Sequence, residues 1–116
     1  MNVEMLKNAG IDVEDGLRRF MNSEQMFEKF LRKFVGNEQY AIFMRELGNP
    51  EATAEQLFEY AHALKGICGN LSLKGILEVL HPMVEVLRGG SLDGVREQAP
   101  MLEERYQRTI SAIESL

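Results

Sequence analysis

The sequence has little of what marks a disulfide scaffold, a membrane protein or a nucleic-acid-binding protein. It contains one cysteine, so no disulfide forms within the chain, which fits a reducing cytoplasm. No apolar run approaches the roughly 20 residues of a membrane-spanning helix. The net charge is −5 and no basic run occurs, which argues against binding nucleic-acid phosphates. Charged and polar residues interrupt the N-terminus, so we expect a cytoplasmic protein without a signal peptide.

Proline and β-type alternation are also scarce, and this indicates an all-α chain. The three prolines stand at positions 50, 82 and 100, and no stretch alternates convincingly with period two. Gly48-Asn49-Pro50 is a clear break, and Gly89-Gly90 stops a helix. We expect a single domain over residues 1–116, built as an antiparallel four-helix bundle with one or two short extra N-terminal helices.

Capping residues predict where several helices begin. Asp12 is a good N-cap for a short N-terminal helix, and either Asn22 or Ser23 can cap the next one. Thr53 followed by Gln56 has the pattern of a capping box.

Apolar residues three and four apart predict which helix faces are buried. Between residues 23 and 47 this face comprises Met26, Phe27, Phe30, Leu31, Phe34, Tyr40, Phe43, Met44 and Leu47. Gly36-Asn37 should end or bend this helix. Pro82 lies inside a later helix, where we expect a kink because proline removes a backbone donor and clashes with the preceding turn. The last helix has Pro100 in its first turn and should bury Leu102, Tyr106, Ile110, Ile113 and Leu116.

Two adjacent stripes make the helix after Thr53 the most informative part of the chain. The first is apolar, should pack on the core, and consists of Leu57, Ala61, Leu64, Cys68 and Leu71. The second consists of Phe58, His62, Lys65, Gly66 and Gly69. Each glycine inside a helix costs roughly 1 kcal/mol relative to alanine. Two glycines beside a histidine therefore suggest that another molecule approaches the backbone closely there.

The same stretch resembles the histidine-phosphotransfer (HPt) domain family. The matching residues of its His-x-Leu-Lys-Gly pattern are His62, Leu64, Lys65 and Gly66. Gly69 fits the small residue that follows, and residues 10–20 look like the family's opening helix. The resemblance implies a helical bundle that accepts a phosphoryl group on His62 and passes it to or from an aspartate of a receiver domain. The implied partners are response-regulator receivers and a hybrid histidine kinase, and we expect a monomer.

The chemistry of these residues agrees with that role. Neutral imidazole is a nucleophile. Lys65, one turn after His62, disfavours the imidazolium and can pair with phosphoryl oxygens. Phe58 is a candidate docking contact, and Gly66 and Gly69 would clear space for the partner. We expect no cofactor, because the family implies that the receiver supplies the divalent metal. No nucleotide site or kinase machinery is present, so we do not expect an enzyme.

Two other interpretations use the same helices. Glu59-x-x-His62 and Glu78-x-x-His81 are paired motifs of the kind that build di-iron carboxylate sites in helical bundles. Such ligands must point inward, yet Glu59 and His62 lie off the apolar stripe. The other alternative is a receiver-binding module that carries no phosphate. The chain departs from the family at Ser72, where members often have glycine, and at Leu80-His81-Pro82, which interrupts a helix that is commonly continuous.

Overall fold

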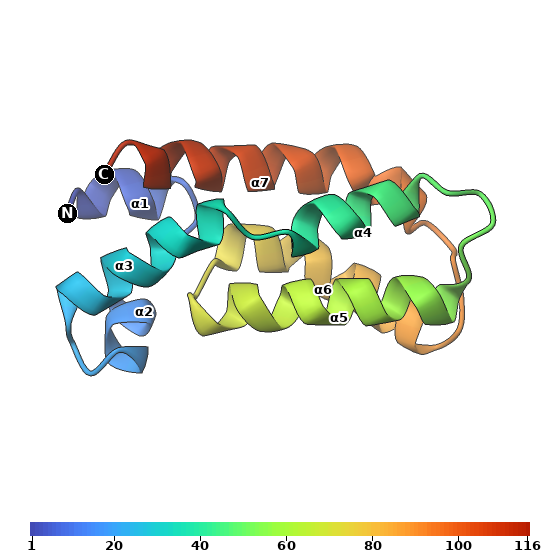
Figure 1. Ribbon diagram of the computed structural model, residues 1–116, viewed down its shortest axis with the longest axis horizontal. Coiled ribbons are helices and arrows are strands. Elements are labelled where there is room, and N and C mark those ends of the chain that lie inside the picture. Colours follow the sequence, from blue (N-terminus) through green and yellow to red (C-terminus); the bar gives the residue numbers. More distant parts are fainter.

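The computed structural model describes all 116 residues and contains helices and no strand, which confirms the all-α prediction (Figure 1). The elements are α1 (Val3–Asn8), α2 (Val13–Arg19), α3 (Glu24–Val35), α4 (Gln39–Leu47), α5 (Ala54–Asn70), α6 (Lys74–Arg88), the short 3-10 helix η1 (Arg96–Gln98) and α7 (Ala99–Glu114). None of these helices combines the length and the apolar character needed to cross a bilayer.

The longer helices lie side by side in an elongated body of 42 × 23 × 20 Å. α5 packs against α4 and α6, α6 packs against α7, and α7 packs against α3. The short helix α1 contacts α7, and α2 contacts α3. Both chain termini lie at the same end of the molecule (Figure 1). Two short N-terminal helices are therefore present, as the sequence predicted.

Side-chain caps begin four of the helices. The side chains of Asn2, Asp12, Ser23 and Thr53 each accept a hydrogen bond from a backbone N–H in the first turn. At Thr53 the Gln56 side chain accepts from the Thr53 N–H in return, so the predicted capping box is confirmed. Ser23 is the cap of α3, whereas Asn22 adopts a left-handed conformation with φ 61°.

The break between α3 and α4 is held by the side chain of Asn37. Its amide nitrogen donates to the Phe34 carbonyl oxygen at 2.7 Å and to the Tyr106 hydroxyl at 2.9 Å. Its amide oxygen accepts from the backbone N–H of Tyr40 at 3.1 Å. The rings of Tyr40 and Tyr106 stack with centroids 3.5 Å apart. The chain therefore ends one helix and starts the next where Gly36-Asn37 predicted a break.

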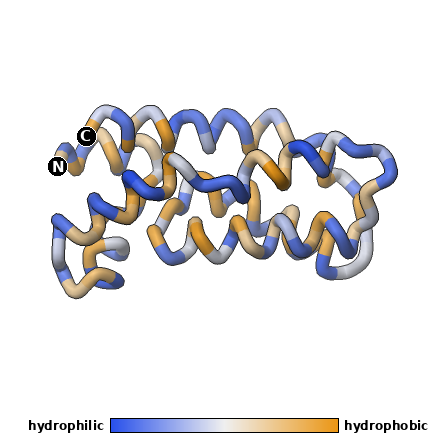
Figure 2. Tube along the Cα trace, viewed as in Figure 1, coloured by the Kyte–Doolittle hydropathy of each residue, from blue (hydrophilic) through white to orange (hydrophobic).

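The core contains the apolar stripe of α5 in full: Leu57, Ala61, Leu64, Cys68 and Leu71 are all buried. Hydrophobic positions recur along every long helix between hydrophilic ones (Figure 2). On α3 the prediction is partly wrong. Phe27, Leu31 and Phe34 are buried, but Met26 is 46% and Phe30 36% exposed. α3 packs against α7 and the short α2, and this packing leaves Met26 and Phe30 partly exposed.

α6 runs from Lys74 to Arg88 with Pro82 inside it, so the helix is not interrupted at Leu80-His81-Pro82, and the kink expected at Pro82 stays a prediction. Pro82 itself is exposed, while Met83 and Val84 beside it are buried. The neighbouring apolar side chains thus hold α6 on the core on both sides of the proline.

The segment containing α1 and α2 is fastened to the turn between α5 and α6. The Gly75 N–H donates to the Gly10 carbonyl at 2.8 Å, and the Asp12 N–H donates to the Ser72 carbonyl at 2.9 Å. Gly10 has φ +91°, and a Cβ there would lie 2.8 Å from the Gly75 Cα, so the close approach requires glycine. Ser72 is fully buried with φ 56°, and its hydroxyl donates to the carboxylate of Asp15.

Candidate functional site

His62 lies in the middle of α5 with its side chain exposed. The opposite side of the same helix is anchored in the core, where Leu57, Ala61 and Leu64 have no exposed surface. The helix therefore holds the imidazole in place through its buried stripe while leaving it open to solvent.

An aromatic ring and a guanidinium group line up beside the imidazole. The Phe58 ring stacks on the His62 ring with centroids 5.2 Å apart and an interplanar angle of 11°. The Arg88 guanidinium of α6 lies 5.0 Å from the centroid of the Phe58 ring. Phe58 is half-buried and packs against the core.

The carboxylate of Glu85 lies near two cations beside His62. The Lys65 ammonium lies 4.0 Å from Oε1 of Glu85, and Nε of Arg88 lies 3.5 Å from the same oxygen. We call Phe58, His62, Lys65, Glu85 and Arg88 the His62 face. Glu85 and Arg88 were not predicted to belong to this site. Their opposite charges three residues apart on one helix were visible, but the packing of α6 on α5 brings them to Lys65 and Phe58.

Gly66 and Gly69 have open space where a side chain would project. A Cβ added to either glycine would have no atom within 4 Å, apart from its chain neighbours and the nearby backbone of its own helix. At Gly16, by contrast, a Cβ would lie 2.3 Å from the Phe27 ring. Packing inside the molecule therefore explains glycine at position 16 but not at positions 66 and 69.

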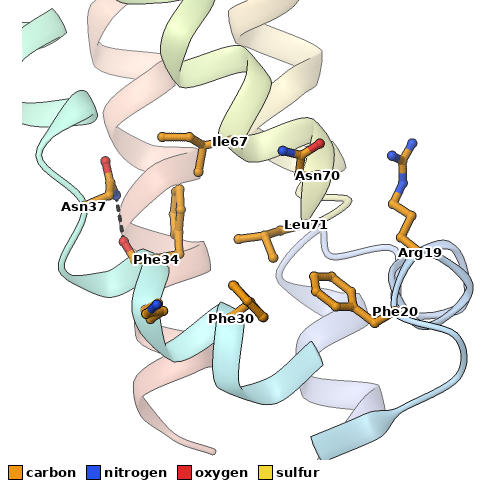
Figure 3. Close-up of a pocket in the computed structure, with 9 residues that line it drawn as sticks. Arg19, Phe20, Phe30, Phe34, Asn37, Ile67, Asn70 and Leu71 are labelled. Atoms are coloured by element: carbon orange, nitrogen blue, oxygen red, sulfur yellow. Dashed lines mark hydrogen bonds between the residues drawn. The ribbon is translucent and has the colours of Figure 1, made fainter. Parts of the chain in front are cut away.

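A groove of about 580 Å³ opens beside the C-terminal end of α5, between it and α2 and α3 (Figure 3). Phe20, Phe30 and Leu71 point toward its centre in Figure 3. Ile67 and Asn70 also line it, and they directly follow Gly66 and Gly69 on α5. Further lining residues are Arg19, Lys33, Phe34 and Asn37. α5 therefore contributes residues both to the groove and, at other positions, to the His62 face.

The residues of the two Glu-x-x-His motifs do not converge. Glu59, His62, Glu78 and His81 are all exposed. Glu78 pairs with Arg105 of α7 at 2.8 Å. No three or more histidine, cysteine or acidic side chains lie together as a metal-holding group would. The inward-facing ligands that the di-iron interpretation requires are therefore not observed.

Cys68 belongs to the core and not to the His62 face. It is fully buried, and burial raises the pKa of its thiol to about 12. The side chain is therefore a neutral thiol that packs as a small hydrophobic group.

A family model described as Hpt domain matches residues 24–114, which contain the whole His62 face. The chain belongs to the Hpt domain family. No curated protein and no solved structure matches it. Hpt domains act in histidine phosphotransfer within phosphorelays, generally without a kinase site of their own, and they work with receiver domains and histidine kinases. In this Hpt domain the matched region begins at α3, so α1 and α2 lie outside it.

Proposed function

We propose that this Hpt domain carries a phosphoryl group on His62 and exchanges it with aspartates of receiver domains. The observation that supports this most directly is the placement of His62, exposed on a helix whose opposite side is fully buried. The nucleophile is thereby held on a rigid element and open to a second protein. A receiver or a hybrid histidine kinase would donate the phosphoryl group, and a second receiver would accept it.

In the uptake step, the imidazole nitrogen without a proton attacks the phosphorus of a receiver aspartyl phosphate. The P–N bond forms as the P–O bond to the aspartate breaks, and the aspartate leaves as a carboxylate anion. The other ring nitrogen then releases its proton to solvent, and transfer to the next receiver reverses these events. The transition state is loose, so the protein contributes mainly positioning and charge neutralisation. The divalent metal would come with the receiver, so we propose no cofactor held by this chain.

Each neighbour of His62 has a part in this proposal. Lys65 would neutralise phosphoryl oxygens, since it lies one turn from His62 and its side chain is 28% exposed. Phe58 would orient the imidazole by stacking on it and give the receiver an apolar contact. Gly66 and Gly69 would leave room for the receiver's approach, because no side chain fills that space.

We place the receiver over the groove as well as over the His62 face. Both surfaces include residues of α5: Ile67 and Asn70 line the groove, and His62 and Lys65 belong to the His62 face. Of the five large apolar side chains that the molecule exposes, Met21, Met26 and Phe30 belong to the α2–α3 region. Arg19 and Lys33 also line the groove and give it positive charge, which would favour an acidic receiver surface.

We also propose that the long helices form the family's antiparallel four-helix bundle. α3 and α4 together would be one member, and α5, α6 and α7 the others. The contacts support this, because α4 packs on α5, α5 on α6, α6 on α7, and α7 back on α3.

Replacement of His62 by glutamine tests the function. Because the side chain is exposed, we expect His62→Gln to keep the wild-type Tm and to lose all phosphate uptake from a phosphorylated receiver domain. His81→Gln is the matched control, since His81 is also exposed, on α6, but lies outside the His62 face. The measurement is acid-labile phosphate on the domain after incubation with the phosphorylated receiver.

Two outcomes would contradict the proposal. Label retained by His62→Gln and lost by His81→Gln would move the site to His81. A wild-type domain that binds the phosphorylated receiver without taking label would be a binding module.

A further inference from the structure

We propose that Glu85 is a built-in counter-anion that competes with the phosphoryl group for Lys65 and so sets how strongly this Hpt domain retains phosphate. The inference rests on the proposed function and assigns a regulating residue to the same site. Glu85 would act through Lys65 and Arg88, so it is a positioning residue and not a catalytic one.

The geometry places the Glu85 carboxylate between the two cations of the His62 face. Its Oε1 is 4.0 Å from the Lys65 ammonium and 3.5 Å from Nε of Arg88. The Glu85 side chain is 47% exposed, so it is free to move away from Lys65. Lys65 is therefore already paired in the phosphate-free molecule.

Arg88 links this ion pair to the imidazole. Its guanidinium lies over the Phe58 ring at 5.0 Å, and the Phe58 ring stacks on His62 at 5.2 Å. Arg88 can keep Glu85 when Lys65 leaves it, because the Glu85–Arg88 pair lies within one helix, three residues apart. The exchange of partners by Lys65 thus leaves no charge of this face without a partner.

The charges decide the direction of the effect. A phosphoryl group on His62 carries close to two negative charges near neutral pH, and the carboxylate carries one. Lys65 therefore favours the phosphoryl oxygens, but it must first give up Glu85, and the two anions repel each other. Both effects make phosphorylated His62 less stable than it would be without Glu85. Removing the charge of Glu85 should shift the phosphoryl equilibrium from the receiver toward the Hpt domain.

Glu85→Gln keeps the shape of the side chain and removes its charge. With one receiver domain at a fixed ratio, we expect the equilibrium constant for phosphoryl transfer onto His62 to rise about two- to fivefold, the range of a single exposed ion pair. The increase should shrink as salt is raised, because salt screens exposed charges. Glu78→Gln is the matched control: Glu78 is also exposed on α6, but it pairs with Arg105, and its loss should leave the equilibrium unchanged.

The outcomes separate this inference from the function on which it rests. Label on the wild type with an unchanged equilibrium for Glu85→Gln, or an equal shift for Glu78→Gln, overturns the role of Glu85 alone. A shift that does not respond to salt also overturns it, since a merely structural change would behave in that way. A wild type that takes no label overturns both proposals.

Discussion

At Gly66, a single substitution should slow the approach of the partner without lowering the stability of the fold. It lies one turn beyond His62, and an added side chain would project into open space. Leucine is the better helix former by up to about 1 kcal/mol. We expect Gly66→Leu to keep or raise the Tm and to slow transfer from a phosphorylated receiver, because the isobutyl group would hold the two proteins apart. Thermal melting and single-turnover transfer measure the two effects.

Two results would contradict this expectation. A Gly66→Leu domain that unfolds would show that Gly66 is a packing contact. Transfer at the wild-type rate would show that the receiver docks on another face.

Single residues also show what the sequence could and could not predict about the site. His62, Lys65 and Gly66 were found because their spacing on one helix is a local pattern. Glu85 was missed because its contact with Lys65 joins two helices, and helical periodicity does not identify the partner across such an interface. Phe30 was predicted to be buried from its position on an apolar stripe, but it lines the groove, where it contacts Phe20 and remains 36% exposed.

At the scale of helices, the packing of α2 on α3 depends on Gly16. This glycine is buried, and a Cβ there would lie 2.3 Å from the ring of Phe27, which is itself fully buried. We expect Gly16→Ala to lower the free energy of unfolding by about 1–3 kcal/mol, the usual cost of overpacking, despite alanine's better helix propensity. Urea denaturation checks this, with Gly66→Ala as the control that should not be destabilised.

If Gly16→Ala proves as stable as the wild type, α2 and α3 are not packed as tightly as described. A loss confined to α2, seen as hydrogen exchange there without a change in global unfolding, would instead show that α2 unfolds separately.

Helix starts were easier to predict than helix neighbours. The caps at Asp12 and Thr53 need only residues within the same turn, so the sequence shows them directly. The break after α3 was also predicted. One of the hydrogen bonds that hold it could not be, because it joins Asn37 to Tyr106 of α7, which is distant in the sequence. α6 runs through Pro82 without interruption, and the neighbouring Met83 and Val84 are buried in the core.

For the molecule as a whole, Asp15 links stability to pH. The Ser72 hydroxyl, followed by Arg19, lowers the pKa of Asp15 well below its ordinary range. Its carboxylate also lies near Arg18 and Lys74. Because its pKa is lower in the folded state, the ionised Asp15 carboxylate stabilises the fold fully above about pH 4, where this group is ionised in the unfolded chain as well. It is lost as the pH falls further, because the unfolded chain takes up the proton first.

We therefore expect Asp15→Asn to be less stable than the wild type at neutral pH and the difference to shrink below about pH 4. Urea denaturation of both proteins from pH 7 to pH 3 measures it. Glu14→Gln is the control for the loss of one negative charge on the same helix, where Glu14 is exposed and pairs with Lys7 of α1. A difference between Asp15→Asn and the wild type that stays constant over this range would contradict the role of the carboxylate.

The contacts of Gly10, Asp15 and Ser72, which join the α1–α2 segment to the α5–α6 turn, have a consequence for how such a protein can diversify. The α1–α2 segment lies outside the region that matches the family, yet it supplies Arg19 and Phe20 to the groove. It is joined to the α5–α6 turn by a few backbone and carboxylate contacts, well away from His62 along α5. Mutations in the short α1–α2 segment can thus change one wall of the proposed recognition surface. The helix that carries the histidine can stay unchanged while the choice of partner evolves.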